Sequence, residues 1–188
     1  LNILPAEVAR ELKNTGSSEA RHIEQATILF TDFQGFTEAS ERLTPQELVE
    51  ELDTCFKAFD AIITTRGIEK IKTIGDAYMA AGGLQRQRPG TVAEVVHAAL
   101  DMQDFMRTRK AERTAKGRPA FDMRVGIHTG PVVAGIVGVK KFQYDIWGDT
   151  VNTANRMESS GEVGRVNISE ATYALVKDAK KVREVNGE

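Results

Sequence analysis

Two aspartates lie beside apolar segments, where an uncompensated carboxylate is costly. Asp32 directly follows Ala26–Thr31, a run that predicts a buried strand, and Asp76 lies in a hairpin between 68–74 and 77–81. If these strands are neighbours, the two carboxylates repel each other unless a cation lies between them. Mg²⁺ binds through one or two carboxylates and substrate phosphates, so the pair predicts a metal site. Taken singly, each has an alternative role, as a helix or turn cap for Asp32 and as an ordinary turn acid for Asp76.

The five residues after Asp32 favour the metal interpretation. They are Phe33, Gln34, Gly35, Phe36 and Thr37. A short glycine-containing loop between a strand and a helix turns backbone N–H groups outward, which is how proteins cradle phosphates. An acid pair beside such a loop favours metal chemistry on a triphosphate. Two ions about 3.5–4 Å apart can activate an attacking oxygen and stabilise a leaving one.

Helical patterns predict the elements that support these residues. Thr44-Pro45-Gln46-Glu47 is a capping box with proline at the first helical position, and it opens an amphipathic helix. Residues 91–94 resemble a second capping box ahead of another apolar helix. Further helices are expected over 3–13, from Thr150 to Met157, and after Ser169.

Strand and loop patterns alternate with these helices. Residues 123–128 predict a strand, and 132–139, broken by Gly135 and Gly138, predict a turn and a strand pair. The polar segment 110–119 is expected to be a solvated loop. The chain therefore predicts one mixed α+β domain, an α/β sandwich built in layers.

The composition excludes two classes of protein. The 188 residues carry a net charge of −2, with 41% hydrophobic and 28% charged residues, which suits one globular domain. A nucleic-acid-binding protein would show a basic excess, so no nucleic-acid partner is expected. No run of about 18 apolar residues occurs, so no membrane span is expected in this chain. The single cysteine, Cys55, is expected in the core and fits a reducing compartment.

Four segments, in order and at the right spacing, resemble the catalytic domain of class III nucleotidyl cyclases. They are Phe30–Thr37, Ile71–Met79, Arg124–Gly130 and Gln143–Met157. The first two resemble the metal-binding motifs of the family and the third its central strand. The fourth resembles its substrate and transition-state segment. The resemblance covers the chain from about His22 to about Val176.

The resemblance implies a fold and a metal site. The family fold is a ferredoxin-like, palm-type βαββαβ core, and active sites form between two such domains. Asp32 and Asp76 would hold two Mg²⁺ or Mn²⁺ ions per active site. The backbone of Phe33 and Gln34 would lie near the metals, and the loop 33–37 would lie near the substrate phosphates.

The resemblance also implies residues for substrate recognition and catalysis. Lys72 and Asp145 would read the adenine edge, since a carboxylate accepts from the amino group and a lysine donates to a ring nitrogen. Guanylyl cyclases of this family carry Glu and a small polar residue at these two positions, so the pair predicts ATP. Asn152 would position the ribose, and Arg156 would stabilise charge at the α-phosphate. These last two are four residues apart and would share one helix face.

One chain carries both halves of the site that the family shares between domains. The simplest expectation is therefore a head-to-tail homodimer with two equivalent sites, which would make cyclic AMP and pyrophosphate from ATP. The alternatives are a guanylyl or dual-specificity cyclase and, in a different class, a non-catalytic nucleotide-binding regulatory domain. Such non-catalytic domains normally lose a metal acid or the transition-state arginine, and this chain has both.

The two ends of the chain carry further expectations. Residues 1–20 are expected to be a helix and linker from an upstream regulatory region, and 21–188 the catalytic domain. The chain starts at Leu1, so it is expected to be a piece of a longer protein. The family usually continues into a C-terminal hairpin with a phosphate-binding lysine that has no counterpart here, so the domain is expected to be C-terminally incomplete. The expected location is the cytoplasm, in a soluble or membrane-attached protein.

Overall fold

The computed structural model describes residues 4–85, 88–138 and 141–178. Its sheet has the strand order β2-β3-β1-β4-β5 with antiparallel neighbours, and β6 pairs parallel to β4. The strands are β1 (Arg21–Gln34), β2 (Glu69–Ile74), β3 (Ala77–Gly82), β4 (Asp122–Val137), β5 (Gln143–Trp147) and β6 (Val166–Ile168). The helices are α1 (Ala6–Thr15), α2 (Phe36–Arg42), α3 (Pro45–Thr65), α4 (Thr91–Ala115), α5 (Asp149–Ser159) and α6 (Glu170–Val176).

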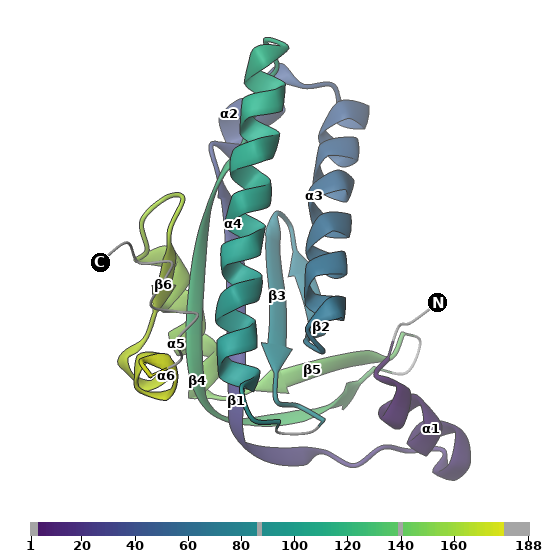
Figure 1. Ribbon diagram of the computed structural model, residues 1–188. Coiled ribbons are helices and arrows are strands. Elements are labelled where there is room, and N and C mark those ends of the chain that lie inside the picture. The colour runs from purple at the N-terminus through teal and green to yellow at the C-terminus, as the bar shows by residue number, and fades with distance from the viewer. Residues whose placement is uncertain (1–3, 86–87, 139–140, 179–188) are drawn as a thin grey trace.

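The succession of elements confirms the α+β fold with a βαββαβ core. Helices α2 and α3 follow β1, the hairpin β2–β3 comes next, and α4 leads into β4. The long helices α3 and α4 run side by side over one face of the sheet (Figure 1). Helix α5 packs against β4 and β1. The central strand β1 therefore has helices on both faces, and its residues 26–31 are all buried.

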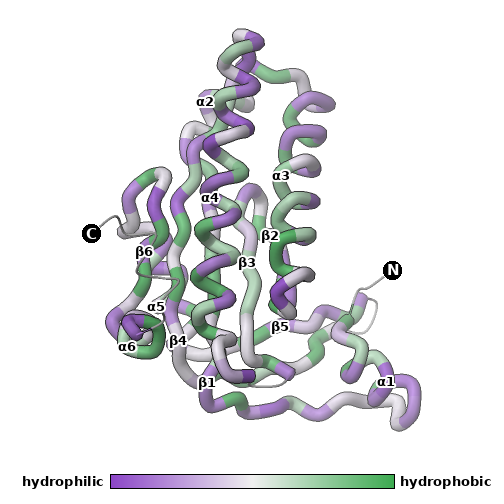
Figure 2. Tube along the Cα trace, viewed as in Figure 1, coloured by the Kyte–Doolittle hydropathy of each residue, from purple (hydrophilic) through white to green (hydrophobic). Residues whose placement is uncertain are grey.

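Side-chain alternation along the strands divides the core in two. On β1, Leu29 packs with Phe59 of α3 and Met102 of α4, whereas its neighbour Ile28 packs with Ala154 of α5. Successive side chains of a strand point to opposite faces, so one apolar run supplies both cores. The buried residues of α3 include Cys55, Phe59 and Ile63, and those of α4 include Val95 and Met102. Figure 2 shows hydrophobic and hydrophilic residues interspersed along both helices.

Several local predictions are confirmed. Helix α3 begins with the expected capping box, in which Glu47 N–H donates to the Thr44 hydroxyl at 3.2 Å and Thr44 N–H donates to Glu47 at 2.9 Å. The hairpin β2–β3 turns at Gly75, whose φ of +60° is the left-handed conformation that glycine adopts without strain. The last helix, α6, has Ser169 as its N-cap.

Two predictions for α4 are wrong. The expected capping box at 91–94 is absent, because Gly90 is the N-cap and the Thr91 hydroxyl instead donates to the Arg88 carbonyl at 2.8 Å. The expected solvated loop over 110–119 is helical as far as Ala115. Its charged side chains are not all solvated, because Arg113 is buried against an acidic residue of α3.

Two strand predictions also need correction. Strand β1 extends to Gln34, so Asp32 lies within the strand and not after it. Strand β4 continues through Gly135 as far as Val137, because pairing with β5 carries it across the glycine. Val139, at the end of the expected strand pair, lies outside the described residues. Among the residues that are described, no helix is both long and apolar enough to cross a membrane.

Candidate active site

The two acids predicted to bind metal are brought together. Asp32 lies near the end of β1, and Asp76 lies in the β2–β3 turn. Strands β1 and β3 are antiparallel neighbours, with Thr31 opposite Tyr78, so both acids lie at the same end of the strand pair. Burial, followed by repulsion from Asp76, raises the pKa of Asp32 to about 6. The carboxylates therefore hold a concentrated negative charge in a partly buried place.

This donor set fits a hard divalent cation. A cation between two mutually repelling carboxylates would relieve the repulsion that raises the Asp32 pKa. Within the described segments, no group of three or more His, Cys, Asp or Glu residues forms a metal site. Oxygen ligands beyond Asp32 and Asp76 would therefore come from backbone, water or substrate phosphates, as Mg²⁺ sites in phosphate-handling proteins commonly use.

A neighbouring cation was missed by the sequence reasoning. Arg124 on β4 lies opposite Asp32 in the strand register, with its Nη2 3.9 Å from the Asp32 carboxylate. Its Nε donates to the buried Glu158 of α5 at 3.0 Å. Arg124 partly offsets the charge of Asp32, while Glu158 adds to it. The available signal was a lone arginine within the otherwise apolar strand 123–127.

The segment 33–37, expected to be a loop, consists of the end of β1, Gly35 and the start of α2, and it is called loop 33–37 below. Its side chains are divided between core and solvent. Phe33 is buried and Phe36 is partly buried, and both rings pack against Phe121. Gly35 has a φ of +74° and is exposed, as is Thr37. The aromatic side chains are therefore unavailable to a substrate, whereas the backbone of this segment and the exposed Thr37 hydroxyl could meet phosphates.

Lys72 and Asp145 form an ion pair although 73 positions separate them in the sequence. Lys72 Nζ donates to Asp145 Oδ2 at 2.6 Å, from β2 to β5. The second oxygen, Oδ1, accepts from the backbone N–H of Ile146 at 2.8 Å. Both side chains are largely buried, at 30% exposed for Lys72 and 12% for Asp145. A charged donor and a charged acceptor are thus held side by side.

Asn152 and Arg156 lie one turn apart on α5, and both are exposed. Within the described residues, neither side chain has a hydrogen-bond or ion-pair partner. The helix that carries them lies very close to the sheet, because Gly126 of β4 faces its backbone and an added Cβ there would overlap it. The backbone of these two residues is therefore held in position, whereas the ends of their side chains are free.

The structure thus forms three separate pairs out of the predicted residues. They are Asp32 with Asp76, Lys72 with Asp145, and Asn152 with Arg156. No hydrogen bond or ion pair joins either acid of the first pair to Arg156 in the described part of the chain. The single chain does not assemble all six residues into one contact network.

Comparison with known proteins assigns the chain to a family. The family model of the adenylate and guanylate cyclase catalytic domain matches residues 18–188. This chain belongs to that family. Its catalytic domain is of class III, as the four sequence segments indicated.

Similar proteins include both kinds of cyclase. An adenylate cyclase of Mycobacterium tuberculosis is 42% identical over 184 residues, covering 97% of this chain and 41% of the relative. Guanylyl cyclase C of Sus scrofa is 41% identical over 189 residues, covering 99% of this chain and 17% of the relative. The solved adenylyl cyclase CyaB from P. aeruginosa has a TM-score of 0.81 at 30% identity, covering 86% of this chain and 84% of that one. The chain therefore spans less than half the length of either of these curated relatives.

Proposed function

We propose that this domain is an adenylyl cyclase, which converts ATP to 3′,5′-cyclic AMP and pyrophosphate. The observation that carries the proposal is the Lys72–Asp145 pair, at 2.6 Å. Adenine presents an amino donor beside a ring-nitrogen acceptor, and guanine presents the reverse pattern. A carboxylate accepting from the amino group and an ammonium donating to the ring nitrogen fit adenine. The guanylyl cyclases among the relatives keep a guanylyl or dual-specificity enzyme as the second candidate.

Asp32 and Asp76 are the proposed ligands of two Mg²⁺ or Mn²⁺ ions, with Phe33 contributing its backbone. When bound, such ions acidify an attacking hydroxyl and neutralise leaving phosphates. The backbone of the loop 33–37 would hold the phosphates, because its aromatic side chains are packed in the core. The ribose 3′-hydroxyl would attack the α-phosphorus, and the bond to the leaving pyrophosphate would break. A hydroxyl acidified by a bound ion can lose its proton to solvent, so no protein general base is required.

Asn152 and Arg156 are proposed to act on a nucleotide held by a second copy of the chain. Their exposed side chains would orient the ribose and stabilise the charge that develops on the α-phosphate. Donors aimed at developing charge contribute about 3–4 kcal/mol to lowering a barrier. Their lack of partners within the described residues supports a head-to-tail homodimer, in which each site takes its acids from one chain and these donors from the other.

The remaining expectations concern the protein around this domain. Residues 1–20, which include α1 (Ala6–Thr15), are proposed to connect the catalytic domain to upstream regulatory domains. The curated relatives are longer than this chain, which supports additional domains in the whole protein. The cytoplasm, where ATP is available, is the proposed location.

Base preference tests the proposal directly. The purified chain should turn over ATP at least about tenfold more efficiently than GTP, because a wrong base leaves buried polar groups unpaired. A Lys72→Glu, Asp145→Ser double variant should lose ATP turnover and gain GTP turnover. Lys70→Glu, the same substitution at a lysine of the same strand that pairs with Asp60, is the control and should keep the ATP preference. Equal kcat/KM for GTP and ATP in the unmodified chain would refute the assignment of base.

A further inference from the structure

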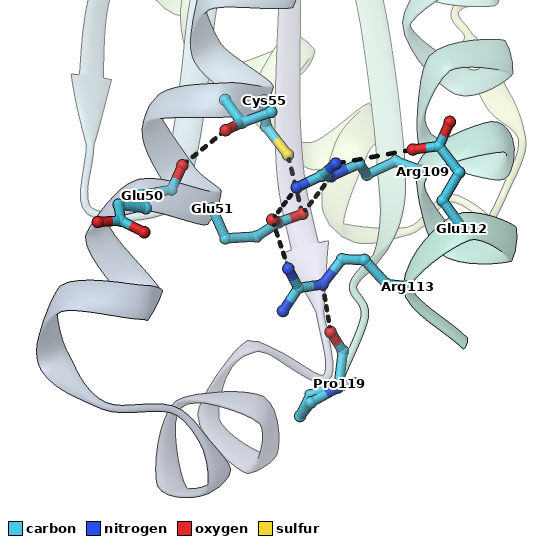
Figure 3. Close-up of polar contacts among 8 residues, drawn as sticks. Glu50, Glu51, Cys55, Arg109, Glu112, Arg113 and Pro119 are labelled. Atoms are coloured by element: carbon cyan, nitrogen blue, oxygen red, sulfur yellow. Dashed lines mark hydrogen bonds and ion pairs between the residues drawn. The ribbon is translucent and has the colours of Figure 1, made fainter. Parts of the chain in front are cut away.

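A buried charge cluster that includes neither Lys72 nor Asp145 joins the two long helices. Glu51 of α3 is 3% exposed and lies between Arg109 and Arg113 of α4 (Figure 3). Arg109 donates to both carboxylate oxygens, from Nε at 3.0 Å and from Nη2 at 2.7 Å. Arg113 Nη1 donates to the same carboxylate at 2.8 Å. Three charge-assisted hydrogen bonds therefore converge on one buried acid.

Stability is a poor explanation for this cluster. Removing charges from water costs about as much as their attraction returns, and well-packed apolar residues often stabilise a core equally well. Arg109 also pairs with Glu112 of α4 at 3.6 Å, so the two guanidiniums face two carboxylates and the cluster has no excess charge. Arg113 Nη2 is buried without a hydrogen-bond partner among the described residues. A role in fixing local geometry is the alternative to a role in stability.

The contacts of Arg113 show which segments the cluster holds together. Its Nε donates to the carbonyl oxygen of Pro119 at 2.6 Å, so the same guanidinium holds α3 and the segment after α4 (Figure 3). Two residues further on, Phe121 is 3% exposed. The planar guanidinium fork can satisfy two acceptors in fixed directions, which a single-point cation such as lysine cannot do.

Phe121 links the position of the Pro119 segment to the residues that follow Asp32. Its ring stacks on Phe33, with centroids 5.1 Å apart, and lies against Phe36 at 5.5 Å. Phe33 directly follows Asp32 in β1, and Phe36 begins α2. The Phe33 ring also meets Phe56 of α3 at 6.1 Å. The loop 33–37 is therefore held between rings whose positions depend on α3 and on the Pro119 segment.

We propose that Arg113, held in place by Glu51, is a positioning residue for the metal- and phosphate-binding loop 33–37. It acts through Pro119 and Phe121 and touches neither substrate nor metal. The proposal rests on the proposed nucleotidyl cyclase function for its kinetic consequences only. Its structural consequence, the order of the loop, can be measured without any reaction.

The test is Arg113→Met in the purified chain, with Arg66→Met as its matched control. Arg66 also bridges to α4, through Glu94 at 2.6 Å and Asp101 at 2.5 Å, but at the other end of α3. Arg113→Met leaves Glu51 paired with Arg109 and removes the bond to Pro119. Hydrogen exchange of the amides in 33–38 should accelerate about tenfold in this variant and stay unchanged in the control.

Ligand measurements complete the test. The Mn²⁺ dissociation constant, measured by electron paramagnetic resonance with a non-hydrolysable ATP analogue, should rise about threefold to tenfold in Arg113→Met. The apparent Mg²⁺ activation constant should rise equally. Phe121→Leu, in which Arg113 is intact, should also accelerate exchange in the loop and raise the Mn²⁺ dissociation constant. This variant tests the proposal if Arg113→Met does not fold. Arg113→Lys should restore little, because one ammonium cannot span both acceptors.

The outcomes separate this proposal from the proposed function. If both methionine variants lose similar stability and neither alters loop exchange or the Mn²⁺ dissociation constant, the cluster only joins helices and the proposal is wrong. If the unmodified chain forms no cyclic nucleotide, the proposed function fails. The exchange comparison would still decide whether Arg113 positions the loop.

Discussion

Gly126→Ala is the substitution whose consequence the structure specifies most sharply. Gly126 lies on β4 beneath α5, and a Cβ added there would lie 2.5 Å from the Glu158 Cα and 2.5 Å from the carbonyl carbon of Met157. Both atoms belong to the helix backbone, so no side-chain rotation can relieve the overlap. The helix itself must move away from the sheet.

The size of that movement follows from ordinary contact distances. Two carbon atoms approach to about 3.5 Å, and the Glu158 backbone nitrogen is nearer to the added Cβ than either carbon, so α5 must shift by at least about 1 Å. Overpacking of this kind costs about 1–3 kcal/mol, which leaves a typical domain folded. Asn152 and Arg156 would move with the helix, and a misplacement of about 1 Å can cost about 100-fold in rate. We therefore expect kcat to fall about 100-fold in a folded protein.

The assay is cyclic nucleotide formation at saturating ATP, with thermal unfolding measured on the same sample. Gly135→Ala is the control on the same strand, because the nearest atom to its added Cβ is the Ala20 Cβ at 3.5 Å, an ordinary contact. It should keep kcat within about twofold. A folded Gly126→Ala chain with unchanged kcat would show that the placement of α5 does not limit catalysis.

Two further outcomes are expected. Burial raises the pKa of the Cys55 thiol to about 12, so at about pH 8.5 the thiol stays protonated in the folded chain and is half ionised in the unfolded chain. A disulfide reagent should therefore label this single cysteine only in denaturant. Rapid labelling of the native chain would contradict its burial. Asp32→Ala and Arg156→Ala chains should each be inactive alone, yet an equal mixture should regain about a quarter of the activity, because half of the dimers would hold one intact site. No recovery in proven mixed dimers would refute a site shared in this way.

Features that depend on a few neighbouring residues could be predicted from the sequence. Examples are the capping box from Thr44 to Glu47, the turn at Gly75 and the N-cap at Ser169. The interacting residues in each of them lie within three positions of one another. The acid pair was also predictable, since the hairpin that carries Asp76 could be recognised locally. Its pairing with Asp32 then needed only the assumption of neighbouring strands.

Features that depend on distant partners could not be predicted in this way. The segment 110–119 is rich in charge, which is typical of a solvated loop, but Glu51 from another helix neutralises part of that charge and the helix continues. Arg124 was not recognised as part of the site for the same reason. Its partner Glu158 is 34 positions away, and the local signal, a lone arginine in an otherwise apolar strand, does not show which residues it contacts.

The strand β4 links features that the proposed dimer would divide between two sites. Arg124 and Gly126 are two residues apart and share one face of the strand. Arg124 contacts both Asp32 and Glu158, and the missing side chain of Gly126 lets α5 pack close to the sheet. The distance between the acids and the exposed donors of one chain is therefore fixed by a single strand. In a head-to-tail dimer, those donors would serve the site whose acids come from the partner. A shift of α5 in one chain would then impair the site of the other, while the acids beside it kept their own geometry.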